Sequence, residues 1–230
     1  SRASAAGIDR ALTLTEADTD TWVVVLTGAG GKAFCAGADL KEVAAGRAKT
    51  LGTERGGFAG FVNYPRDKPW IAAVEGFALG GGFEIVLSCD MVVAAETATF
   101  GLPETSRGLM AAAGGVYKLP RLLPRNVAIE LIATGKLLSA AQAQAHGLVN
   151  RVAAQGSALN VAVELAQAVA QCAPVAVRES LKVARLAADL DDAELRVVMR
   201  QAFERNASAE DYREGPRAFL EKRAPQWVGR

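Results

Sequence analysis

Apolar residues in the first half of the chain form short continuous runs that end at glycines or polar residues. Three of these runs cover residues 22–27, Trp70 to Val74 and Met91 to Ala95. Each run is too short for a typical helix and has the composition of a strand that is buried on both faces. We therefore expect strands at these positions and a shorter strand at Leu148 to Val152.

Helical patterns lie between these runs. Asp39 to Gly46 begins with a residue that can cap a helix, has Glu42 where it would complete a capping box, and ends at a glycine. A second helix is expected at Phe83 to Cys89, directly after three glycines. Alternating strands and helices predict a mostly parallel sheet with helices packed on it.

The second half is rich in Ala, Leu, Gln and Arg and has a helical pattern almost throughout. Helices are expected from an N-cap at Ser157 to Cys172, from Pro174 in a first turn, and from Leu190 to Arg205. The simplest organisation is a single functional unit. It has an α/β core over residues 1–153 and a helical lobe over residues 154–230 that packs on the core or on another subunit.

The composition excludes several classes of protein. The 26 Lys+Arg and 25 Asp+Glu residues balance, so no basic surface for nucleic acid is expected. No apolar segment reaches the ~20 residues of a membrane span, and the first residues lack the core of a signal peptide. The three cysteines are far apart, which argues against a disulfide framework or a zinc site. The lack of a membrane span and the cysteine usage predict a soluble, cytoplasmic protein. The preference for Arg over Lys predicts a bacterial origin.

Few side chains could act as a nucleophile or an imidazole base. His146 is the only histidine and precedes a glycine at a predicted helix end, where a structural role is favoured. Cys35 lies in a glycine-rich turn and is interpreted as a small buried residue, so covalent acyl transfer is disfavoured. Gly28, Gly30 and Ala33 fit a dinucleotide-binding fingerprint only loosely, because the chain turns again instead of opening a helix.

Two glycine-rich turns each lead into a predicted helix. One is Gly80 to Gly82, which precedes an apolar helix, and the other is Ala36 to Asp39. Unpaired backbone N–H groups at helix starts attract negative charge, and two such donors from separate loops could stabilise an enolate or a tetrahedral oxyanion. Two tight strand-to-helix turns without a ligand fit the same spacing.

Two carboxylates lie close to these turns in the sequence. Glu84 is one helical turn beyond Gly81, and Glu104 follows Pro103 in the turn FGLPE. Two carboxylates beside an oxyanion site could divide general-acid and general-base work. Other acidic residues nearby are interpreted as structural, with Asp39 and Glu42 as helix caps, Asp90 at a helix end, and Glu75 and Glu96 in turns.

Six segments in order resemble the enoyl-CoA hydratase/isomerase (crotonase) family, and together they cover nearly the whole chain. They are VVVLTGAGGKAFCAGADLKE, KPWIAAVEGFALGGGFEIVLSCD, ATFGLPETSRGL, AAAGGVYKLPRLLP, AIELIATGKLLSAAQAQAHGLVNRV and EGPRAFLEKRAPQWVGR. The resemblance implies an α/β fold, a crotonase-like spiral of ββα units with a helical C-terminal lobe. The family's first pair of strands is expected to be missing, with residues 1–20 forming the helix that follows it.

The resemblance also implies a set of site residues. It assigns the two backbone N–H groups that hold a thioester carbonyl to Ala38 and Gly81, and the two hydratase carboxylates to Glu84 and Glu104. It places contacts with coenzyme A at Ala36, Asp39, Leu40 and Lys41. It implies no metal and no cofactor apart from the coenzyme A of an acyl-CoA thioester substrate, and assembly into a homotrimer or a dimer of trimers.

Both carboxylates are present, which favours syn addition of water to a 2-enoyl-CoA to give a 3-hydroxyacyl-CoA, as in fatty-acid β-oxidation or related acyl-CoA degradation. We prefer Glu104 as the acid that protonates the carbon α to the thioester carbonyl. A related isomerase, dehydratase or hydrolase is the first alternative, because a fold does not fix a reaction. A non-catalytic binding protein of the same fold is the second. The segment 110–115 departs from the family's P-G-A-G-G pattern, which leaves the acyl preference open.

Overall fold

The computed structural model describes residues 1–230 and has two four-stranded sheets at its centre. The first sheet has the order β1 (Val24–Thr27), β5 (Trp70–Val74), β7 (Met91–Ala95) and β10 (Arg151–Ala153). All of its neighbouring strands are parallel. Every residue of β5 is buried, as the continuous apolar run predicts.

The second sheet has the order β2 (Ala33–Cys35), β6 (Phe77–Leu79), β8 (Thr99–Gly101) and β9 (Leu137–Ser139). Only the β8–β9 pair is antiparallel. Along the chain, β1 and β2 lead into one helix, β5 and β6 into the next, and β7 and β8 into a third. The predicted α/β fold built from repeating strand–strand–helix units is therefore confirmed.

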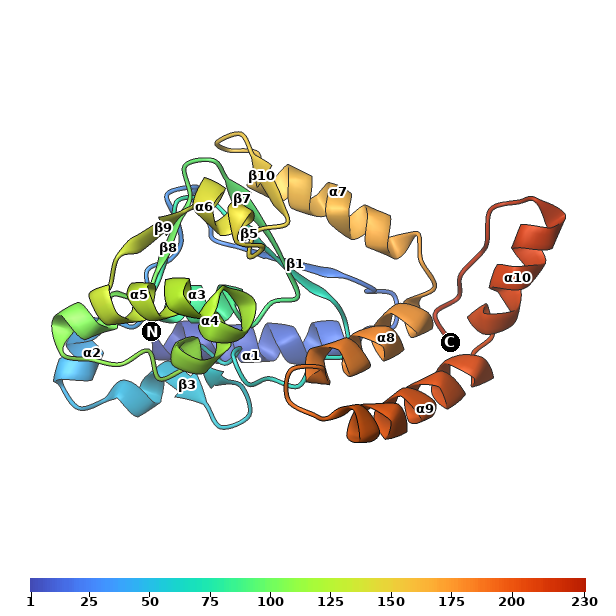
Figure 1. The fold of residues 1–230 in the computed structure, drawn as a ribbon, viewed down its shortest axis with the longest axis horizontal. Coiled ribbons are helices and arrows are strands. Elements are labelled where there is room, and N and C mark those ends of the chain that lie inside the picture. Colours follow the sequence, from blue (N-terminus) through green and yellow to red (C-terminus); the bar gives the residue numbers. More distant parts are fainter.

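Helices cover the sheets and form the second half of the chain (Figure 1). The α-helices are α1 (Arg2–Ala17), α2 (Leu40–Ala44), α3 (Gly81–Val86), α4 (Gly115–Leu122), α5 (Arg125–Thr134), α6 (Ala140–Ala145), α7 (Ala158–Ala170), α8 (Pro174–Leu186), α9 (Asp192–Ser208) and α10 (Asp211–Glu221). Two 3₁₀-helices, η1 (Ala48–Leu51) and η2 (Pro103–Arg107), and the hairpin β3 (Gly52–Thr53) and β4 (Gly57–Phe58) complete the elements.

The main core lies between the two sheets and the helices that pack on them. It contains 28 buried residues, among them Phe83 and Phe100, whose ring centroids lie 5.4 Å apart. Burial of a side chain of this size contributes about 1.5–3 kcal/mol. All six residues of α3 are buried. Because α3 is anchored on every side, the one acidic residue that it carries has a fixed position.

The strand predictions agree closely with the structure, with two shifts. The strands at Trp70–Val74 and Met91–Ala95 match their predicted bounds, and β1 begins two residues later than expected. The fourth strand lies at Arg151–Ala153 instead of Leu148 to Val152. Leu148 N–H and Val149 N–H donate to the Ala143 carbonyl at the end of α6, so this part of the apolar run ends a helix.

The capping box predicted at the start of α2 is only half formed. Asp39 accepts a hydrogen bond from the Lys41 N–H at 3.0 Å, but Glu42 binds Arg47 at 2.8 and 2.9 Å instead of completing a capping box. The helix that Asp39 caps, α2, ends at Ala44, two residues before the predicted end at Gly46. A two-point ion pair is stronger than a bond to one exposed N–H, which explains the choice of partner for Glu42.

The start of α7, after Ser157, is capped by Glu75, a residue far away in the sequence. The Ser157 side chain makes no capping bond. Instead Glu75 accepts from the Ala158 N–H at 2.9 Å and from the Gly156 N–H at 3.2 Å. Glu75 is 8% exposed and therefore acts as a buried cap for α7, not merely as a turn residue.

The last two helices, α9 and α10, extend away from the sheets (Figure 1). The preceding helix, α8, stays attached to the body of the molecule, because Arg185 pairs with Asp90 at 2.7 Å. Pro174 occupies the first turn of α8, as expected. Phe219 and Leu220 on α10 are 83% and 80% exposed. No single helix is long and apolar enough to span a membrane. Only α7 and α8 taken together have that length and apolar composition, and they are bent by 107° where they join.

Candidate active site

Glu84 lies on the buried helix α3 and is 3% exposed. Its Oε1 accepts a hydrogen bond of 2.8 Å from the Gly115 N–H, at the start of α4. Burial raises the pKa of Glu84, and the negative charge of Glu104 raises it further, while the Gly115 N–H and the Lys118 ammonium group lower it. The carboxyl group is therefore held in a fixed direction, with a raised affinity for a proton.

Glu104 lies in the 3₁₀-helix η2, directly after Pro103. Its Oε2 is buried and has no hydrogen-bond partner in the chain. Burial raises the pKa of Glu104, and the Arg107 guanidinium group partly opposes this effect. An unpartnered buried polar atom costs about 1–3 kcal/mol, and such atoms in native structures are commonly explained by function. The Glu104 Oε1 lies beside Gly80, whose carbonyl accepts a hydrogen bond of 3.0 Å from the Glu84 N–H, so both glutamates adjoin the start of α3.

Ala38 and Gly81 line the same cavity of about 150 Å³, together with Glu104. Gly81 is the first residue of α3, so its N–H has no partner within the helix. The Ala38 N–H makes no hydrogen bond to the backbone or to a side chain. The structure therefore brings two free backbone donors and a carboxyl group together at one cavity.

Close contacts explain why three glycines occur in succession at this point. A Cβ on Gly80 would lie 2.8 Å from the Glu104 Oε1, and one on Gly81 would lie 2.3 Å from the Phe58 ring. A Cβ on Gly82 would collide with the Cys35 carbonyl oxygen at 2.0 Å. Each glycine makes room for a different neighbour, so the run serves the packing of the site as well as the helix start.

The comparison with known families agrees with this arrangement. The family model for enoyl-CoA hydratase/isomerase matches residues 5–230. The chain belongs to the enoyl-CoA hydratase/isomerase family.

Individual members of the family are similar over most of their length. A carnitinyl-CoA dehydratase of Salmonella typhi is 42% identical over 218 residues, which are 93% of this chain and 84% of that protein. An enoyl-CoA hydratase structure from Mycobacterium tuberculosis H37Rv has a TM-score of 0.94 and 38% identity, and the match covers 100% of this chain and 89% of that one. A carnitinyl-CoA hydratase structure from Mycobacterium avium has a TM-score of 0.76 and 43% identity, with 99% and 88% covered. These relatives support a hydratase-type reaction on an acyl-CoA thioester.

The segment that the family resemblance assigns to coenzyme A is only partly gathered at the site. Ala36 and Leu40 line the 150 Å³ cavity. Asp39 and Lys41 lie outside its lining, with Asp39 engaged as the cap of α2 and the Lys41 side chain exposed. The two lining residues can contact a ligand held by Ala38, whereas the other two would meet only parts of a ligand that extend from the cavity.

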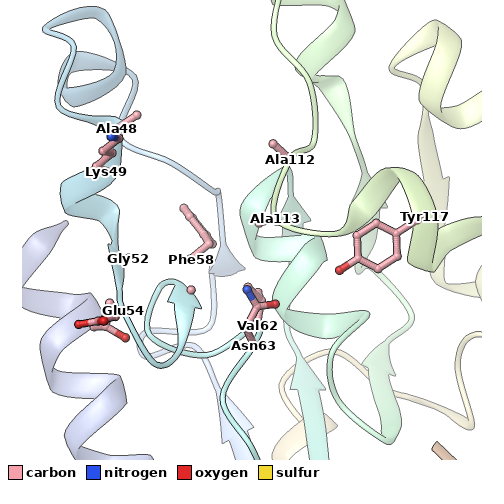
Figure 2. A pocket seen from close by; sticks show the side chains of 12 residues that line it. Ala48, Lys49, Gly52, Glu54, Phe58, Val62, Asn63, Ala112, Ala113 and Tyr117 are labelled. Carbon is pink, nitrogen blue, oxygen red and sulfur yellow. The ribbon is translucent and has the colours of Figure 1, made fainter. Parts of the chain in front are cut away.

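A larger cavity, of about 640 Å³, was not predicted from the sequence (Figure 2). It lies between the β3–β4 hairpin and the segment before α4. Its lining includes the polar side chains of Lys49, Glu54, Asn63 and Tyr117. Figure 2 shows the Tyr117 hydroxyl directed toward Asn63 across the cavity. The departure of residues 110–115 from the family pattern was a sequence signal for this region.

Phe58 connects the two cavities. Its ring lies against Gly81, which lines the small cavity, and Phe58 itself lines the large one. Ala113, two residues before the Gly115 that binds Glu84, also lines the large cavity. A ligand held at the Gly81 N–H could therefore extend past Phe58 into the larger space.

His146 and Cys89 lie outside the linings of these two cavities. His146 forms the C-cap of α6 and is followed by Gly147 at φ +83. Burial raises the pKa of the Cys89 thiol to about 12, so this group is protonated and unreactive near neutral pH. No three His, Cys, Asp or Glu side chains come together in a group that could hold a metal ion.

Proposed function

We propose that this protein adds water reversibly to a 2-enoyl-CoA to give a 3-hydroxyacyl-CoA, with no cofactor other than the coenzyme A of the substrate. The observation that carries this proposal is the meeting of Ala38, Gly81 and Glu104 at one cavity, with Glu84 held close by. Two fixed donors and two carboxyl groups of raised pKa are the groups that the reaction requires.

The donors would act on the thioester carbonyl. Addition of water to the double bond moves negative charge onto the carbonyl oxygen, and the Ala38 and Gly81 N–H groups are in place before this charge develops. Donors that need no reorganisation stabilise the transition state more than the ground state. Removing one donor of this kind typically costs about 3–4 kcal/mol of activation free energy.

The carboxyl groups would handle the protons. The Glu84 Oε1 accepts a bond from Gly115, which favours its ionised form, whereas the Glu104 Oε2 has no donor to stabilise a charge. Glu84 therefore takes a proton from water as the water oxygen bonds to C3. The double-bond electrons take a proton from Glu104 at C2. Return of one proton from Glu84 to Glu104 restores the starting state.

The assay follows the ultraviolet absorbance of the conjugated thioester of a short 2-enoyl-CoA, which disappears on hydration. Wild-type protein is expected to hydrate it, and Glu84→Gln and Glu104→Gln are each expected to be slower by about 10²–10⁴-fold, the usual contribution of general acid–base catalysis. Lys136→Met, a change at a side chain that is 67% exposed, serves as the control. A wild-type rate no higher than that of the two Gln variants would refute the proposal.

Dehydration of carnitinyl-CoA is a second candidate, which the names of two relatives suggest. Glu54 and Tyr117 line the larger cavity, and a carboxylate and an aromatic ring both attract a quaternary ammonium group. Glu54→Gln should then slow turnover of carnitinyl-CoA more than that of an uncharged 3-hydroxyacyl-CoA. Equal effects on both substrates, or no turnover of carnitinyl-CoA, would exclude this candidate.

We also propose assembly into a homotrimer or a dimer of trimers. The support is the apolar surface of the C-terminal lobe, where Phe203, Phe219 and Leu220 are 55%, 83% and 80% exposed. Phe203 lies on α9 and the other two on α10, which contacts α9. Large exposed apolar side chains on neighbouring helices are typical of interaction surfaces. Sedimentation equilibrium should give three or six times the chain mass of 24.0 kDa, and a mass equal to that of one chain would contradict the proposal.

A further inference from the structure

The Lys118 ammonium group is connected to the backbone of Glu84 through Ser88. Lys118 belongs to α4, three residues after Gly115, and its Nζ donates to the Ser88 Oγ at 2.7 Å and to the Val62 carbonyl at 3.2 Å. Its side chain is half-buried. Neither acceptor is a carboxylate, so the positive charge of this group is not neutralised by direct contact.

Ser88 connects this lysine to the backbone of Glu84. The Ser88 hydroxyl accepts from Lys118 and donates to the Glu84 carbonyl at 2.7 Å. At its other end Glu84 accepts from the Gly115 N–H at 2.8 Å. Glu84 is therefore bound to α4 twice, by its carboxylate at the helix start and by its backbone through Ser88 and Lys118. This double connection fixes the separation of α3 and α4 where the carboxylate lies.

Five other charged side chains line the same cavity as Lys118: Arg66, Asp90, Arg121, Arg185 and Asp189. Four of them form ion pairs with each other, Arg185 with Asp90 and Arg121 with Asp189. Lys118 is the cation that lowers the pKa of Glu84, against burial and the charge of Glu104, which raise it. The groups that act on Lys118 are Arg66, Glu84 and Cys89. Burial and the Arg66 guanidinium group lower the pKa of Lys118, and Glu84 raises it. Glu84 and Lys118 thus favour each other's charged forms.

We propose that Lys118 is a positioning residue for Glu84: through its bond to Ser88 it fixes Glu84 against α4, so that the carboxylate that accepts a proton from water keeps its place. This inference rests on the proposed function, because it assigns Glu84 the role of base. Lys118 and Ser88 do not contact the substrate in this account, and they affect the reaction only by holding Glu84.

Removal of the Lys118 charge changes the pKa of Glu84 in one direction. Without Lys118 the pKa of Glu84 rises, so its basic form is reached only at higher pH. The acidic limb of the pH profile of kcat/KM then moves to higher pH. A residue with a purely structural role would lower the amount of folded protein and leave this limb in place.

The test compares Lys118→Met, Lys118→Arg and the surface control Lys136→Met. Lys118 lines a cavity of about 610 Å³ between α4 and α8, so Met, of similar length, can be accommodated. Lys118→Met should lower kcat several-fold with little change in KM, through loss of the connection, and should move the acidic limb to higher pH, so that the deficit is largest below the limb, where the rate follows the ionised fraction of Glu84. Lys118→Arg should restore the position of the limb. A wild-type limb in Lys118→Met, or an Arg variant shifted as far as the Met variant, would overturn the proposal.

Ser88→Ala provides a second test, because it keeps the charge and breaks the connection. It should lower kcat without moving the acidic limb, and a wild-type kcat would overturn the positioning role of Ser88. Carbon-13 NMR titration of the Glu84 carboxyl group, assigned with Glu84→Gln, reports its pKa without turnover. A higher Glu84 pKa in Lys118→Met supports the inference even if hydration is not the reaction, and an unchanged pKa overturns it. Failure of the proposed function is recognised separately, by a Glu84→Gln variant as active as wild type.

Discussion

Gly37→Ala separates the geometry of the two backbone donors from general stability. Gly37 has φ +94, and a Cβ there would lie 2.9 Å from the Leu79 carbonyl oxygen and 3.1 Å from the Gly81 nitrogen. The left-handed conformation costs an alanine about 1–2 kcal/mol. The collision adds a second effect, because relief by even a few tenths of an ångström moves the Gly81 N–H relative to that of Ala38.

Gly30→Ala is the matched control for this change. Gly30 has φ +87 and nothing within 4 Å of the added Cβ, so it carries the same backbone cost without the collision. Gly30→Ala should lose about 1–2 kcal/mol of unfolding free energy, and Gly37→Ala should lose this amount and more, because of the collision. Only Gly37→Ala should also lose activity, by about 10²-fold, the effect of misplacing a catalytic group or weakening one oxyanion donor.

The assay pairs urea unfolding with initial rates of hydration of a short 2-enoyl-CoA, measured well below the unfolding transition. The expected result is that both variants are folded under the assay conditions and that their values of kcat/KM differ widely. Equal rates in folded Gly37→Ala and Gly30→Ala would refute the reasoning, because the spacing of the two loops would then have no bearing on the reaction.

Two further predictions concern stability. Burial raises the pKa of Glu104 above that of the unfolded chain, so the folded state binds the proton more tightly and the unfolding free energy falls as pH rises through this interval. Glu104→Gln should therefore gain stability relative to wild type between pH 4 and pH 7 in urea titrations, and an advantage that is the same at both pH values would contradict this. Glu75→Ala should lose about 1–2 kcal/mol, because the start of α7 loses its cap, with Glu96→Ala, at an exposed turn, as the control. Equal unfolding midpoints for these two variants would refute that role.

Much of the fold could be predicted because its signals are local. A strand buried on both faces must be apolar at every position, and Trp70 to Val74 satisfies this without reference to any other segment. The site could be predicted as far as it depends on short spacings, such as the single helical turn between Gly81 and Glu84. The capping box expected at Asp39 failed because Glu42 had a stronger partner in Arg47.

The rest of the site depends on approaches between distant segments. The Gly115 N–H that orients Glu84 comes from a residue 31 positions away, and the Lys118 bond to Ser88 spans 30 positions. Glu75 caps a helix that begins 83 residues later. Phe58 lies over Gly81 only because a short hairpin folds back on α3. No periodicity or spacing in one sequence encodes such contacts.

The most direct test of the central claim is the turnover number for hydration of a short 2-enoyl-CoA in Glu84→Gln, Glu104→Gln and the double variant. If the two carboxyl groups act on one water molecule, each single change lowers kcat by about 10²–10⁴-fold, and the double variant is scarcely slower than the slower single variant, as for residues that act as a unit. Losses that multiply in the double variant, or a single variant that retains the wild-type rate, would contradict the account.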